Sequence, residues 1–125
     1  NLSKKSDAPK YINAFYNYLD FLADLKTSHS EIAATIEKYI TPYIQYYCKS
    51  LAHRLLKTTV SQRKGMTVSG FINNCTHYVK LLSDKEASLQ VNQFSIRFAK
   101  FIDDNLLLRS LYLLFRKFYS KPIYS

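Results

Sequence analysis

Turn-forming residues are scarce in this chain, which has two glycines and three prolines among its 125 residues. All-β domains need many tight turns, and glycine and proline supply most of them, so a sandwich or barrel is disfavoured. Long apolar runs are also missing. The longest candidate, 106–118, is interrupted by Arg109, Ser110, Arg116 and Lys117, whereas a membrane-spanning helix needs about 20 apolar residues.

Cysteine is equally rare, with only Cys48 and Cys75. Both fall at apolar positions of helical patterns, where a free thiol behaves as a small hydrophobic group. One possible bridge is not a disulfide framework, so we expect buried, unpaired thiols and a cytoplasmic or nuclear protein. The first residues, Asn-Leu-Ser-Lys-Lys, lack Met and the apolar stretch of a signal peptide. We therefore expect one domain, 1–125, excised from a longer protein, with a flexible tail at 1–6 and a second tail at 120–125.

Signatures of catalysis are missing from the sequence. The two isolated glycines, Gly65 and Gly70, do not make a phosphate-binding loop, and no nucleophile elbow appears. None of the three histidines is spaced with a cysteine as zinc ligands are. Asp103 and Asp104 are neighbours that cannot face one site on a helix, and we expect them to cap the following helix. We predict that the protein is not an enzyme and holds no cofactor or metal.

Apolar residues at three- and four-residue steps predict helices through most of the chain. They recur in the segments 7–25, 31–57, 67–82, 83–102 and 105–119. Pro42 interrupts the second segment, so that helix either kinks or ends and restarts with Thr41 as its cap, which we prefer. Residues 89–98 also alternate like a strand, but an isolated strand would lack a partner. The predicted fold class is all-α, a single compact bundle of about five to six helices.

The charge is strongly asymmetric. The net charge is +9, and no acidic residue occurs between Glu37 and Asp84. Basic residues gather where the helix ending near residue 57 meets the loop 58–66, and they predict a patch for phosphate or carboxylate groups. Its expected members are Lys49, His53, Arg54, Lys57, Arg63 and Lys64. An ordinary solvated surface explains them equally well.

The last predicted helix, 105–119, is apolar almost all round. A helix in a small bundle normally keeps one polar face, unless it is central or covered by another chain. We therefore predict that Leu108, Tyr112 and Phe115 line an exposed groove or a self-association face, since such patches usually mark interaction sites.

Together these features predict a non-enzymatic protein–protein interaction domain, an adaptor or scaffold within a larger intracellular protein. It would dock a helix or an acidic motif of a partner protein in an apolar groove with a basic rim. A homo-oligomer is a further possibility. The alternatives are a nucleic-acid-binding helical domain, which the charge favours although no recognition signature appears, and binding to an anionic membrane surface.

Overall fold

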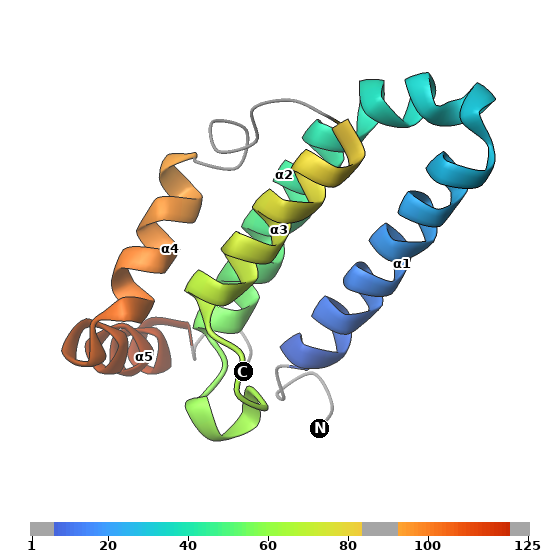
Figure 1. Cartoon of the computed structure of the whole chain (residues 1–125). Helices are drawn as coiled ribbons and strands as arrows, with labels where there is room; N and C mark the ends of the chain where they lie inside the picture. Colours follow the sequence, from blue (N-terminus) through green and yellow to red (C-terminus); the bar gives the residue numbers. More distant parts are fainter. Residues whose placement is uncertain (1–6, 84–92, 121–125) are drawn as a thin grey trace.

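The computed structural model describes residues 7–83 and 93–120, with side chains as far as Phe118. These ranges contain five α-helices and no strand, as Figure 1 shows, which confirms the predicted all-α bundle. The helices are α1 (Ala8–Ser28), α2 (Ala33–Leu56), α3 (Val68–Ser83), α4 (Phe94–Asp104) and α5 (Leu106–Ser120), with 3₁₀ turns at Ser30–Ile32 and Val60–Gln62. Apart from Ser120, which ends α5, the two expected tails lie outside the described residues.

One core joins the first four helices. Helix α2 packs against α1, α3 and α4, and α5 packs mainly against α4. The apolar stripes that predicted the helices supply the core, because residues three and four apart share one face of a helix. Its fully or almost fully buried aliphatic side chains include Ile12, Leu19, Ile44, Leu55, Leu56, Val68, Val79, Leu82 and Ile96. No described side chain of α5 is buried to this degree.

Pro42 lies inside one continuous helix, α2. The first part of α2 crosses the end of the bundle and the rest runs down it behind α3 (Figure 1). Proline lacks the N–H that a helix needs and its ring crowds the preceding turn, which bends the helix without ending it here. The preferred prediction, a new helix that starts at Pro42 with Thr41 as its cap, is therefore wrong, and the kinked alternative holds.

The helix ends agree with the sequence in part. Helix α1 begins after Asp7, where the predicted segment 7–25 starts, and Pro9 lies in its first turn. Helix α1 extends past the predicted end at residue 25 to Ser28, whose hydroxyl donates to the carbonyl oxygen of Asp24. Of the predicted helix 83–102, residues 84–92 lie outside the described ranges. The part from Phe94 onward is helical, so the strand alternative fails there.

Both cysteines are buried and unpaired, which confirms that expectation. Cys48 lies on α2 and Cys75 on α3. A hydrogen bond between the two thiols, together with burial, raises the pKa of Cys75 far above its usual value. The thiolate is the reactive form, so both features suppress reactivity.

We therefore expect a thiol reagent such as dithiobis(nitrobenzoic acid) to modify the native protein slowly. In denaturant the same two thiols, Cys48 and Cys75, should react at the rate of a free cysteine. The absorbance of the released thiol measures both rates. Equal rates in the native and denatured protein would contradict the buried arrangement.

Candidate interaction surface

A sharp corner at Asn105 joins α4 to α5. Asn105 caps α5, because its Oδ1 accepts a hydrogen bond of 3.0 Å from the backbone N–H of Leu108. Asp104 instead forms an exposed ion pair of 2.9 Å with Lys100 within α4. The prediction that Asp103 and Asp104 cap α5 is therefore wrong. The short amide side chain is better placed to satisfy the free donors, since it directly precedes the first helical residue.

Asp103 instead contacts the N-terminus of α3. Its Oδ2 accepts a hydrogen bond of 3.1 Å from the backbone N–H of Val68, the first residue of α3. Its Oδ1 lies 2.8 Å from Nη1 of Arg63, and both side chains are 2% exposed. Arg63 also donates to the carbonyl oxygen of Thr58 at 2.9 Å. This buried pair ties the end of α4 to the loop before α3, and so it fixes where α5 begins.

The buried position of Arg63 corrects the predicted basic patch. Arg63 was expected on an exposed surface, yet its charge is neutralised inside the protein by Asp103. One sequence signal indicated the buried carboxylate of this pair, although not its partner. Asp103 continues the buried stripe of α4 formed by Ile96 and Ala99, at steps of three and four. A carboxylate at such a position needs a cation or several donors, because a buried unpaired charge is very unfavourable.

Most of the remaining patch stays at the surface. Lys49, Lys57 and Lys64 are exposed. Arg54 is also exposed, and its guanidinium carbon lies 4.5 Å from the ring centre of Tyr11. His53 is half-buried, with Nε2 at 2.9 Å from the hydroxyl oxygen of Ser95 on α4. His53 and Arg63 are therefore held by partners within the chain. The six residues do not form one continuous, outward-facing basic patch.

The structure adds one cation that the sequence did not place with the patch. Partial burial of its ammonium group, and then the charges of Arg116 and Arg54, lower the pKa of Lys57. Arg116 comes from α5, so the end of α2 and the inner side of α5 bring three positive side chains into one cluster.

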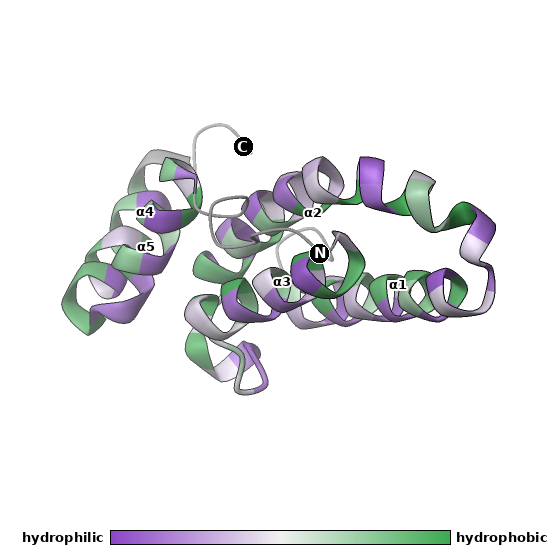
Figure 2. Cartoon of the chain, turned by 45° about the horizontal axis from the view of Figure 1, so that its top comes forward, coloured by the Kyte–Doolittle hydropathy of each residue, from purple (hydrophilic) through white to green (hydrophobic). Residues whose placement is uncertain are grey.

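Helix α5 directs its most regular apolar stripe away from the bundle. The stripe consists of Leu107, Leu111, Leu114 and Phe118, which are 67%, 52%, 52% and 68% exposed. The half-buried side of the helix includes both of its arginines, Arg109 and Arg116. Figure 2 shows that α4 and α5 lie together at one side of the three longer helices. An ordinary surface helix has the reverse orientation, with its apolar face toward the core.

The most exposed apolar side of α5 is rotated about the helix axis relative to the predicted apolar site. Phe115 is exposed, as expected, but Leu108 and Tyr112 are half-buried, and Tyr112 packs against the core. Leu108 and Tyr112 are therefore less exposed than Phe115, and their role in docking stays a prediction. The open side is centred on Leu111 and Leu114, because the turn at Asn105 fixes which side of α5 meets α4.

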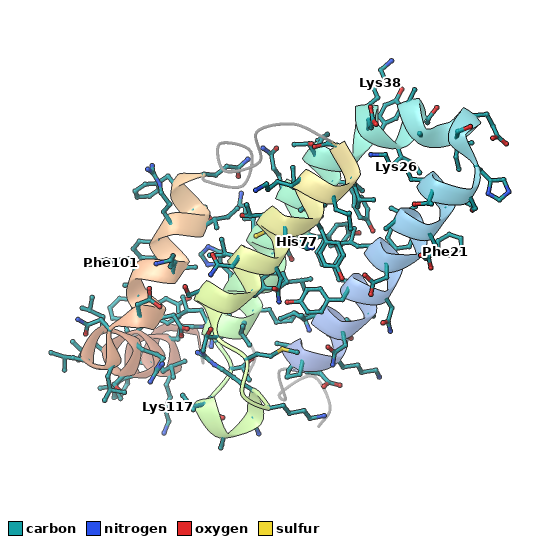
Figure 3. The ribbon with its side chains drawn as sticks, in the orientation of Figure 1. Phe21, Lys26, Lys38, His77, Phe101 and Lys117 are labelled. Carbon is teal, nitrogen blue, oxygen red and sulfur yellow. The ribbon has the colours of Figure 1, made fainter. Side chains whose placement is uncertain are left out.

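Helix α4 extends this exposed area with three phenylalanines. Phe94, Phe98 and Phe101 recur at steps of four and three on its outer side, and Figure 3 shows Phe101 directed away from the other helices. We call the combined set the α4–α5 apolar surface. It comprises Phe94, Phe98, Phe101, Leu106, Leu107, Leu111, Leu114, Phe115 and Phe118.

Other parts of the described structure offer little chemistry. A hollow of about 220 Å³ between α1 and α2 is lined by tyrosine, leucine, isoleucine and threonine side chains. A second hollow, near Gly65 and Gly70, is lined by no carboxylate, histidine or cysteine. Within residues 7–83 and 93–120, no group of three or more metal-ligating side chains is close enough to hold an ion. None of the helices in these ranges has the length and apolarity to cross a membrane.

No family model, curated protein or solved structure matches this chain. The α4–α5 apolar surface is therefore interpreted from its own geometry and charge.

Proposed function

We propose that this chain is a non-enzymatic interaction domain, an adaptor or scaffold, that docks a helix of a partner on the α4–α5 apolar surface. The outward apolar stripe of α5 carries this proposal. Soluble monomers rarely expose a contiguous apolar patch of more than a few hundred Å², and a larger patch usually marks an interaction site. Nine exposed large apolar side chains on two adjoining helices are more than scattered single surface residues account for.

The local structure suits docking. A partner helix would place apolar anchors along the stripe from Leu107 to Phe118, as amphipathic helices do in helix-in-groove complexes. The Arg63–Asp103 pair holds the end of α4, so the surface is preorganised, which lowers the entropy lost on binding. Lys117 and Arg97 are exposed on the same two helices and would favour acidic residues at the edge of a partner.

The cluster of Arg54, Lys57 and Arg116 supports a second candidate function, in which the chain binds nucleic acid or an anionic membrane surface. Phosphate contacts give binding that weakens steeply as salt rises, whereas docking on an apolar surface is far less sensitive to salt. For either function we propose a cytoplasmic or nuclear location, supported by the unpaired thiols.

The proposed function is tested by affinity capture from the native cell, with wild-type protein and a variant carrying Leu111→Gln and Leu114→Gln. Both side chains are exposed, so the melting temperature should stay nearly unchanged while a specific partner is lost. The matched control is Leu81→Gln with Val60→Gln, which changes two exposed apolar residues outside the surface and should retain the partner. Capture of the same proteins by all three chains would refute docking at this surface.

A further inference from the structure

The outward stripe of α5 has the spacing of one side of a helix pair. Leu107, Leu111, Leu114 and Phe118 follow one another at steps of four, three and four. This is the spacing that keeps a seam facing a second helix over about two heptads. Within the described ranges, α5 packs mainly against α4 on its opposite, half-buried side. In the described structure this stripe, called the seam below, is thus left open along its length.

The seam is complementary to itself. When two copies of α5 pair in antiparallel orientation, Leu107 of one copy faces Phe118 of the other, and Leu111 faces Leu114. At the polar edge, Ser110 of one copy faces Lys117 of the other, so no like charges stand opposite each other. Parallel pairing would bring both Lys117 side chains to the same end of the seam. In that arrangement the two helix dipoles would also lie side by side with like ends together, which favours the antiparallel arrangement.

The size of the surface also fits a dimer. A standard stable interface buries roughly 800 Å² on each partner, and a buried phenylalanine contributes about 150–250 Å². The α4–α5 apolar surface contains five phenylalanines and four leucines, and eight of the nine are more than half exposed. The seam itself contains one phenylalanine and three leucines, all more than half exposed. A dimer that also covers adjoining residues of the α4–α5 apolar surface would bury apolar area of the order that a standard interface needs.

We infer that the helix docked on α5 is α5 of a second copy of this chain, so that the protein is a symmetric dimer with an antiparallel α5–α5 seam. This inference rests on the proposed function, since it names the partner of the same surface. A partner held mainly by acidic groups is less favoured than an apolar one, because Arg109 and Arg116 lie on the half-buried side of α5 and leave Lys117 as the only cation beside the seam on this helix.

Salt distinguishes a second copy from an anionic partner. Each copy carries a net charge of +9, so two copies repel each other at long range. Added salt screens charges separated by more than about 8 Å at physiological ionic strength, while apolar burial persists. The dimer should therefore tighten as salt rises. Binding to nucleic acid, anionic lipid or an acidic helix should weaken instead.

The first experiment is analytical ultracentrifugation of the purified chain in a dilution series at low and high NaCl. We expect a monomer–dimer equilibrium that tightens with salt. Leu111→Glu with Leu114→Glu should weaken the dimer by more than about a hundredfold, because each carboxylate would be buried unpaired in the seam. The matched control, Asn13→Glu with Asn17→Glu on exposed positions of α1, changes the net charge equally and should retain the dimer.

The second experiment tests the orientation of the seam. A chain with Leu111→Cys is mixed with a chain with Leu114→Cys under mild oxidation. The native cysteines are buried, so the introduced thiols react first. Antiparallel pairing should give a disulfide between residue 111 of one chain and residue 114 of the other. Disulfides between identical chains at residue 111 would indicate parallel pairing and overturn the antiparallel seam.

A chain that stays monomeric at every concentration and both salt levels would overturn the inference. If Leu111→Gln with Leu114→Gln still abolished capture from cells, the proposed function would stand with a different partner. If capture were also unchanged, both proposals would fail. Association of the monomeric chain with phosphatidylserine vesicles, but not with neutral ones, would assign the stripe to a lipid surface and likewise overturn the dimer.

Discussion

Replacing Asp103 by alanine should lower the free energy of unfolding by about 3–5 kcal/mol, as expected when one partner of a buried ion pair is removed. The guanidinium of Arg63, which is 2% exposed in the intact protein, would lose its carboxylate, and the N–H of Val68 would lose its acceptor. Since small proteins have only about 5–15 kcal/mol of stability, this variant should be close to unfolding. Urea denaturation followed by helical circular dichroism measures the change.

Asp104→Ala is the matched control, because it removes the neighbouring carboxylate from an exposed ion pair with Lys100. Such pairs contribute about 0–1 kcal/mol. The double variant Arg63→Met with Asp103→Leu should recover much of the loss, since apolar residues of similar volume often replace a buried pair without penalty. Recovery should be incomplete, because Val68 still lacks an acceptor. Equal losses for Asp103→Ala and Asp104→Ala would show that the buried pair does not form.

Leu55→Ala should destabilise the protein by about 2–5 kcal/mol, the usual range for a buried leucine in a well-packed core. Leu55 is completely buried on α2. Leu107→Ala makes the same chemical change on α5, where the side chain is 67% exposed. Its effect on the isolated chain should stay within about 0.5 kcal/mol, as for surface substitutions. The difference between the two losses in unfolding free energy shows whether the Leu107 side of α5 faces the core or the solvent.

The comparison is made by thermal and urea unfolding at a protein concentration below that of self-association. At high concentration, Leu107→Ala should acquire a larger effect, because a dimer is stabilised by mass action. A loss from Leu107→Ala at low concentration as large as that from Leu55→Ala would place the α5 stripe inside the core and contradict the outward orientation.

The helical fold was largely readable from the sequence. Apolar side chains at steps of three and four require a helix if they are to share one buried face, and this is a local property. The effect of Pro42 on its helix could not be predicted from the sequence in the same way. Proline weakens a helix at its position, but whether the helix bends or ends depends on what the two halves pack against. That information lies in contacts between α1, α2 and α3.

The candidate site was predictable in kind but not in detail. The excess of apolar residues in 105–119 predicted exposed apolar area, and the structure has it. The half-buried positions of Leu108 and Tyr112 were not predictable, because a helix with apolar residues nearly all round does not reveal which side meets its neighbour. That side is fixed at the Asn105 corner and by the contact of Tyr112 with the core.

The basic patch illustrates a different obstacle. Charge and spacing placed Arg63 beside Lys64 in a loop, with nothing to distinguish them. Only the distant Asp103 separates the two, since one cation lies against that carboxylate and the other is exposed. Pairings between positions far apart in the sequence carry no periodic signal, so a single sequence cannot show them.

The buried pair also limits how this protein can change over evolutionary time. Arg63 and Asp103 each become harmful once the other is gone, so a lineage that loses one charge meets strong selection before the second substitution arrives. Lysine is a poor intermediate for Arg63, because its compact ammonium cannot reproduce the planar set of donors. The two positions should therefore vary together or not at all. The exposed side chain of Lys64 has no such pairing to preserve, although its backbone φ of 54° disfavours β-branched residues at that position.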